Sequence, residues 1–322
     1  MPMKDDEFRT MPIRDPKVTH VAVLMGGLSA EREVSLASGE AVCEALRKVG
    51  YRVTPMDVDH EIATRLADLR PDVAFNALHG RWGEDGRIQG ILEYLRIPYT
   101  HSGVLASALA MDKQRCKPLF AEAGIPVAES RVVPVEEAAE RHPMMPPYVL
   151  KPATEGSSVG IHIVADENVA PVAELMEQRD VYGDFVMVER YVPGRELTCA
   201  VMGTVALGVL EIVPKGTFYD FESKYAEGGS EHICPADIPQ ALMRRIQRLS
   251  LKAHRVLGCR GVTRADFRFD DTAGEDGELV LLEVNTQPGM TRTSLLPDIA
   301  RQVGHSFEDL VIWMVDDAST DR

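Results

Sequence analysis

The sequence predicts an α/β protein whose chain begins with a parallel sheet, and two observations support this. Residues 18–25 and 51–58 are apolar runs typical of buried strands, and the segment between them keeps helical period. Strand, helix and strand in direct succession form a βαβ unit, which favours a parallel sheet. Residues 263–269 and 279–285 are two further strand-like runs joined by a glycine-containing turn, which predicts an antiparallel hairpin later in the chain.

Length and composition exclude several classes of protein. The chain has 322 residues, of which 45% are apolar, so two or three globular domains are expected. A net charge of −15 argues against a nucleic-acid partner, although local lysines and arginines can still bind an anionic substrate. No apolar run approaches the roughly eighteen residues of a membrane span, so no membrane partner is predicted.

The ends and the cysteines indicate a cytoplasmic location. Residues 1–17 are polar and lack the apolar core of a signal peptide, so they are interpreted as a flexible extension. The five cysteines are odd in number and include no CxxC pair. This usage fits a reducing compartment and argues against a zinc site.

In the first part of the chain, Ser29 is expected to cap a helix that ends at Gly50. A helix at 62–69 and a strand at 72–78 follow. The turn after the first strand lacks the G-x-G-x-x-G pattern, which disfavours a dinucleotide site.

The glycine-rich segment 79–86 follows the third strand, where open α/β sheets place ligands. The alternative is a glycine-rich turn with a half-buried His79. Helices are expected at 89–95 and 102–111, with a short strand beginning at residue 98 and a domain boundary near Asp112.

The second part opens with an expected helix at 113–123 and a strand at 131–133. A strand then ends at Lys151 and leads into the Gly- and Ser-rich segment 153–160 before a strand at 161–164. Such a hairpin tip presents backbone N–H groups and hydroxyls to a phosphate. Phosphate binding is favoured over a flexible turn because Lys151 lies beside it.

The next strand, 185–191, runs into a loop, and Glu189 and Glu196 flank that junction. They could bind an adenine and a ribose, or they could be ordinary solvated strand ends. More sheet follows at 197–213. The long aromatic segment 215–230 is interpreted as a lid rather than as a disordered loop.

The last part contains an amphipathic helix at 239–257, the predicted hairpin, and closing helices at 296–303 and 307–315. A spacing of two places Glu283 and Asn285 on one face of their strand, and Arg264 and Asp266 on one face of theirs. Pairing these strands brings three hard oxygen donors together, which suits Mg²⁺. The alternative is a surface hairpin with ordinary charges.

Seven motifs in order resemble those of the D-alanine–D-alanine ligases of the ATP-grasp superfamily, over residues 18–315. They are GGLSAEREVSLASG, LHGRWGEDG, MDK, KPATEGSSVG, GTFYDFESKY, TRADF and LLEVNTQPGMT. The resemblance implies a three-lobed ATP-grasp fold with an N-terminal Rossmann-like domain. The implied divisions are an extension at 1–17, a substrate domain at 18–112, a central subdomain at 113–188 and a C-terminal subdomain at 189–322.

The resemblance also implies a reaction. ATP phosphorylates the carboxylate of one D-alanine, and the amine of a second D-alanine attacks the acyl phosphate to give D-alanyl-D-alanine, ADP and phosphate. It further implies two Mg²⁺ or Mn²⁺ ions, a role in peptidoglycan synthesis and a homodimer, and it leaves activation by K⁺ open.

The resemblance assigns roles to individual positions. The metal ligands are Asp266, Glu283 and Asn285. The first D-alanine is held by Glu31 beside His79, and the second by Ser294 and Leu295. The oxyanion site is Arg264 with the N–H of Gly289, and Glu31 closes the lid together with Ser157 and Tyr225. The nucleotide is held by Lys113, Lys151, Ser157, Lys224, the strand Glu189, Arg190, Tyr191 and Val192, and the ribose carboxylate Glu196.

Three positions depart from the family pattern: Arg190 in place of a lysine, Trp82 in place of a small residue and Gln287 in place of a serine. Tyr225 is kept, which favours an amine as the nucleophile. Two alternatives are a related carboxylate–amine ligase with another second substrate and a nucleotide-binding regulator without activity. The second is disfavoured because Arg264 and the three metal-ligand positions are all present.

Overall fold

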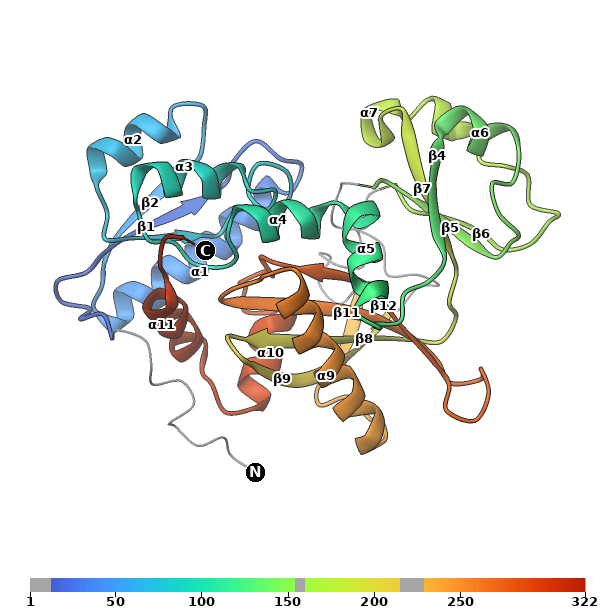
Figure 1. Ribbon diagram of the computed structural model, residues 1–322. Helices are drawn as coiled ribbons and strands as arrows, with labels where there is room; N and C mark the ends of the chain where they lie inside the picture. The colour runs from blue at the N-terminus through green and yellow to red at the C-terminus, as the bar shows by residue number, and fades with distance from the viewer. Residues whose placement is uncertain (1–12, 154–159, 215–228, 322) are drawn as a thin grey trace.

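The computed structural model describes residues 13–153, 160–214 and 229–321, in which the strands form three sheets (Figure 1). Ser157, Lys224, Tyr225 and most of the predicted phosphate loop and lid lie outside the described residues. Within the described ranges, no helix is both long enough and apolar enough to cross a membrane.

The first sheet is parallel, as predicted, with strand order β2-β1-β3. Alternate residues of β1 serve two cores: Val21 and Val23 face one, and Ala22 and Leu24 face the other. The elements of this part are β1 (His20–Met25), α1 (Arg32–Val49), β2 (Arg52–Asp57), α2 (Ile62–Leu69), β3 (Val73–Asn76), α3 (Arg87–Leu95) and α4 (Val104–Met111).

Two local predictions were wrong. Ser29 does not cap α1: Glu31 occupies the N-cap position without a side-chain cap, and the Ser29 hydroxyl donates to the carbonyl of His79 at 2.7 Å. The expected strand at residue 98 is reduced to single bridges from Tyr99 to Ala74 and Ser319. In both places the hydrogen bonds go to residues that are distant in sequence.

The second sheet has strand order β4-β7-β5-β6 and is wholly antiparallel. Its core includes Leu150, Val188 and Tyr182 and is separate from the other cores. Asp112 caps α5 by accepting a hydrogen bond from the Arg115 N–H. The elements are α5 (Lys113–Glu122), β4 (Ser130–Pro134), α6 (Val135–Glu140), β5 (Tyr148–Lys151), β6 (His162–Val164), the 3-10 helix Ala173–Met176, α7 (Arg179–Tyr182) and β7 (Phe185–Arg190).

The third sheet is antiparallel with strand order β10-β9-β8-β11-β12, and the predicted hairpin is its β11–β12 edge. Helix α9 packs on β8, β9 and β11, α10 packs on β8 and β9, and α11 packs against α1. The elements are β8 (Arg195–Met202), β9 (Val205–Pro214), β10 (Ser230–Ile233), α9 (Gln240–Val256), β11 (Val262–Asp270), β12 (Glu278–Asn285), α10 (Leu295–Gln302) and α11 (Phe307–Asp317).

The first and third sheets share one hydrophobic core, in which Val21 of β1, Met202 of β8 and Leu310 of α11 all take part. The second sheet stands apart at the upper right of Figure 1. The predicted boundary between residues 188 and 189 falls within β7, so the proposed division of the chain stays a prediction.

Candidate active site

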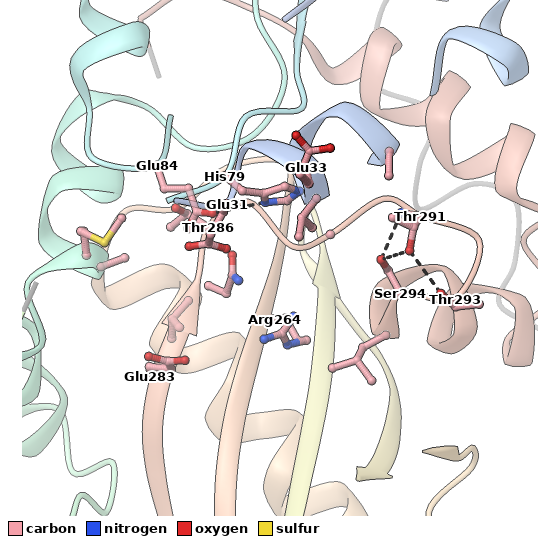
Figure 2. Close-up of a pocket in the computed structure, with 18 of the residues that line it drawn as sticks. Glu31, Glu33, His79, Glu84, Arg264, Glu283, Thr286, Thr291, Thr293 and Ser294 are labelled. Carbon is pink, nitrogen blue, oxygen red and sulfur yellow. Dashed lines mark hydrogen bonds and ion pairs between the residues drawn. The ribbon is translucent and has the colours of Figure 1, made fainter. Parts of the chain in front are cut away.

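A cavity of about 540 Å³ is lined by the start of α1, the loop after β3, the β11–β12 hairpin and the segment after β12. Figure 2 shows Glu31 and His79 on one side and Arg264 and Glu283 on strands facing them. The predicted site residues that line it are Glu31, His79, Lys113, Arg264, Glu283, Asn285, Gly289, Ser294 and Leu295. Glu33, Glu84 and His232 also line it and were not singled out from the sequence.

The first wall holds Glu31 and His79, both buried. The His79 ring contacts the Ser38 hydroxyl at 3.1 Å and the Glu84 carboxylate at 3.4 Å. Gly80 has a φ of +68°, and a Cβ there would lie 2.8 Å from the Glu31 carboxylate oxygen. Glycine is therefore required at residue 80 for both its conformation and its space.

The opposite wall is the hairpin, whose register places Asp266 opposite Glu283 and Arg264 opposite Asn285. The Arg264 guanidinium binds both oxygens of Asp266, at 2.9 and 2.8 Å. Thr198 donates to the same carboxylate at 2.6 Å. The side chains that the sequence predicted to meet are therefore neighbours on paired strands.

The donor set of this hairpin fits a hard divalent cation, because it offers two carboxylates and one amide oxygen on adjacent strands. Among the described residues, no group of three or more His, Cys, Asp or Glu side chains could hold a metal. The hairpin set contains only two side chains of these types, Asp266 and Glu283, because Asn285 is an amide. Any metal here would need further oxygens, which nucleotide phosphates can supply.

The segment after β12 forms the third wall. Thr291 donates its N–H to the Ser294 hydroxyl at 3.0 Å, and the two hydroxyls lie 2.7 Å apart (Figure 2). A Cβ at Gly289 would lie 2.8 Å from that same hydroxyl. Leu295 begins α10, and the first N–H groups of a helix lack intrahelical acceptors. This wall therefore presents hydroxyls and the start of a helix to the cavity.

A cluster of buried ion pairs lies where α5 meets the second sheet. Lys151 Nζ lies 2.6 Å from one oxygen of Glu189, and Lys117 pairs with the other oxygen. Burial by itself would raise the pKa of Glu189, but the two lysines outweigh it and lower that pKa. Lys113 Nζ lies 3.0 Å from Glu283, which raises the pKa of Lys113 although burial opposes its charge.

Lys117 was missed from the sequence, although a signal was present. It lies four residues after Lys113 on the same helix, and this spacing places both on one face.

The remaining predicted nucleotide residues lie outside the cavity lining, where β7 runs toward β8. Arg268 contacts three residues at this junction. Its Nε donates to the carbonyl of Val192 at 3.0 Å, and its guanidinium lies 5.7 Å from the centre of the Tyr191 ring. One of its nitrogens also lies 3.6 Å from Glu196. Arg190 binds Glu278, with 3.2 Å between Nη1 and Oε2. Arg268 was also missed from the sequence.

Comparisons with known proteins agree with the resemblance. The model of the D-ala D-ala ligase C-terminus matches residues 119–316, and the model of the N-terminus matches residues 20–67 and 62–102. The chain is 62% identical over 303 residues to a D-alanine–D-alanine ligase of Parvibaculum lavamentivorans, covering 94% of this chain and 98% of the relative. It is 60% identical over 304 residues to D-alanine–D-alanine ligase B of Mesorhizobium japonicum, covering 94% and 99%.

Solved structures show the same architecture. The D-alanine–D-alanine ligase of Bacillus anthracis complexed with ATP superposes with a TM-score of 0.79 at 28% identity, covering 93% of this chain and 97% of that one. The VanG D-Ala:D-Ser ligase of Enterococcus faecalis superposes with a TM-score of 0.75 at 30% identity, covering 92% and 98%. By its matching models, its close relatives and its fold, the chain belongs to the D-alanine–D-alanine ligase family.

Proposed function

We propose that this chain joins two D-alanine molecules in an ATP-dependent reaction that supplies D-alanyl-D-alanine for peptidoglycan. The observation that supports this most is the convergence on one cavity of Glu31, Arg264, Asn285 and Gly289, which come from three separate segments. The family membership and the identity of about 60% to named ligases support the same reaction.

In the first step, an oxygen of the first D-alanine carboxylate attacks the γ-phosphorus of ATP, and ADP leaves. Lys113 and Lys151 are the cations proposed to meet the phosphates, together with Lys224 beyond the described residues. Both described lysines already lie beside carboxylates, Lys113 at 3.0 Å from Glu283 and Lys151 at 2.6 Å from Glu189. A phosphate can therefore be met by side chains that are already in place.

We assign the divalent cation site to Asp266, Glu283 and Asn285, with Mg²⁺ or Mn²⁺ as the ions. When bound, such ions neutralise phosphate charge during in-line transfer. The nucleotide base and ribose are assigned to the strand end at residues 189–192 and to Glu196. The proximity of Glu189 to Lys151 supports a continuous nucleotide site.

In the second step, the amine of the second D-alanine attacks the carbonyl carbon of the acyl phosphate. The C–O bond to phosphate breaks, phosphate leaves and the amine loses a proton. Arg264 and the Gly289 N–H are proposed to stabilise the oxyanion. Glu31 with His79 holds the first substrate, and Ser294 and Leu295 hold the carboxylate of the second.

The second substrate is the part of this proposal that needs the sharpest test, because a structural neighbour is named a D-Ala:D-Ser ligase. Purified protein is given ATP, Mg²⁺ and D-alanine, alone or with D-serine or D-lactate, and phosphate and product mass are followed together. We expect D-alanyl-D-alanine in step with phosphate. Phosphate without dipeptide, or a preferred mixed product, would overturn the assignment of the second substrate. Adding K⁺ and exchanging Mg²⁺ for Mn²⁺ in the same assay tests the ion requirements.

We further propose a cytoplasmic homodimer. Tyr94 of α3 and Leu105 of α4 are 92% and 69% exposed, and such apolar side chains are suited to a contact between copies. Sedimentation of the wild type and of Tyr94→Glu tests this: a dimer that the variant dissociates is expected, and a wild-type monomer would contradict it.

A further inference from the structure

Gln287 was noted in the sequence only as a departure from the family pattern, and the structure gives it a defined set of partners. Its side chain is 1% exposed and does not line the cavity. It belongs to the segment after β12, two residues beyond Asn285.

The backbone N–H and the side-chain amide of Gln287 form hydrogen bonds with different residues around the site. Its backbone N–H donates to Oδ1 of Asn285 at 2.8 Å. Its Oε1 accepts a hydrogen bond from Nδ2 of Asn76 at 2.6 Å, and its Nε2 donates to the carbonyl of Leu78. One buried residue therefore joins the end of the hairpin, through its backbone N–H, to the end of β3, through its side chain.

Asn76 and Leu78 in turn support the loop that carries His79. Asn76 Nδ2 also donates to the carbonyl of Gly83 at 3.1 Å, and its Oδ1 accepts from the Leu78 N–H at 3.2 Å. The contacts of Gln287 thus reach the first wall through groups that are themselves buried and hydrogen-bonded.

A second link joins the segment after β12 to the first wall. The Met290 N–H donates to the Ser38 hydroxyl at 3.3 Å, and that hydroxyl contacts Nε2 of His79 at 3.1 Å. Both links are hydrogen bonds in a buried environment, where a lost partner leaves a polar atom unsatisfied. Such links fix the distance between the walls, because any separation of the walls breaks the hydrogen bonds.

From this geometry we propose that Gln287 is a positioning residue, which fixes the wall carrying Glu31 and His79 against the wall carrying Arg264 and Asn285. It touches no substrate. Its effect is on the separation between the first D-alanine and the groups that stabilise the reacting centre. This inference rests on the ligase function proposed above.

The experiment compares Gln287→Leu with Gln89→Leu as a matched control. Gln89 is also 1% exposed and donates to the Gly83 carbonyl at 2.8 Å, but that hydrogen bond stays within the first wall. Leucine keeps the volume of each side chain and removes its hydrogen bonds. The readouts are kcat for dipeptide, phosphate released per dipeptide, and ATP affinity measured without D-alanine.

For Gln287→Leu we expect kcat to fall about tenfold or more, because misplacement by an ångström at a reacting centre costs up to a hundredfold. Phosphate released per dipeptide should rise above the wild-type ratio, while ATP affinity stays within about twofold, since the nucleotide residues lie elsewhere. Gln89→Leu should keep kcat within about threefold of the wild type.

Wild-type kcat in Gln287→Leu, or an equal loss in Gln89→Leu, would overturn the inference. If Gln287→Leu does not fold, Ser38→Ala removes the second link, and a folded Ser38→Ala with wild-type kcat overturns it as well. A wild-type protein that forms no dipeptide would instead refute the ligase function itself, so the two failures are distinguishable.

Discussion

The proposed nucleotide side of the site and the proposed substrate cavity are held together by different interactions. Glu189 lies buried between Lys117 and Lys151, so the proposed nucleotide side depends on ion pairs. The His79 ring contacts one carboxylate, Glu84, but the links of its wall to the segment after β12 are made by amides, a hydroxyl and backbone groups. Ion pairs hold the first region together, and hydrogen bonds set the spacing of the walls in the second.

This difference follows from the ligand that each region is proposed to bind. Cations for a phosphate must stay ionised while buried, and only nearby carboxylates can offset the cost of removing them from water. A wall that sets the spacing between two small substrates needs direction rather than charge, and neutral hydrogen bonds supply direction. Loss of a charged group should therefore disturb binding or chemistry strongly, and loss of a neutral group should disturb alignment.

The largest effect is expected at Asp266, whose carboxylate binds the Arg264 guanidinium on the hairpin. In Asp266→Asn one anionic donor is lost and Arg264 loses its charged partner. Turnover should fall about a hundredfold or more, the loss typical of removing one charge-stabilising group. Asp270→Asn on the same strand is the control, because its Oδ1 can still accept from Thr272. Steady-state kinetics measure both, and unchanged turnover in Asp266→Asn would refute the metal assignment.

A smaller effect is expected at Lys117, which holds Glu189 without reaching the cavity lining. Lys117→Met leaves Glu189 with Lys151 alone. We expect the KM for ATP to rise about tenfold, equivalent to about 1.4 kcal/mol, with less change in kcat. Lys252→Met, at an exposed position of α9, is the control. An unchanged KM for ATP would show that the ion cluster is structural only.

A third prediction concerns His254, a buried imidazole of α9 that contacts β11 of the cavity hairpin. Burial lowers the pKa of His254 to about 4, with Arg255 and Arg260 adding to the effect, and its Nδ1 lies 2.8 Å from the Thr263 hydroxyl. The unfolded chain binds a proton below about pH 6.5, but the folded protein does so only near pH 4. Stability is therefore lost as pH falls through this window.

The expected size of that loss is about 2 kcal/mol in the free energy of unfolding between pH 8 and pH 5. Urea unfolding at both values measures it. His254→Gln should show a correspondingly smaller difference, whereas His60→Gln at an exposed position should match the wild type. If His254→Gln retains the full pH dependence, the loss arises elsewhere.

The smallest effect is expected at Cys116, next to the ion cluster. Burial raises the pKa of its thiol to about 11, although Lys113 opposes this. Since only the thiolate reacts, alkylation of native protein at pH 8 should leave Cys116 unmodified. Mass spectrometry of digested protein tests this, with urea-unfolded protein as the positive control. Rapid alkylation of Cys116 in the native protein would mean that the region around the ion cluster opens to solvent.

Much of the fold was predictable because apolar periodicity is local. The strands around Val23 and Leu281, and helix α2 with its bounds, follow from it. The short elements α6 and α7 did not, since four to six residues are too few for a periodic signal. The Ser29 cap failed because the carbonyl of His79, 50 residues away in the loop after β3, accepts a hydrogen bond from its hydroxyl.

The candidate site divides in the same way. A spacing of two was enough to pair Arg264 with Asp266 and to predict that Glu283 lies nearby, because strand geometry is regular. No spacing could predict that Lys117 would reach Glu189, 72 residues away, or that Gln287 would reach Asn76, 211 residues away. Those contacts depend on the packing of elements that are distant in sequence.

The sequence by itself therefore determined most of the longer strands and helices, the family, and the hairpin carboxylates, since each depends on neighbouring residues or on an ordered set of motifs. The tertiary structure alone decided which charges are buried together and which amide spans the two walls. The physical reason is that burial and partner choice are set by chain segments distant in sequence, and the energy of a polar group depends on those partners.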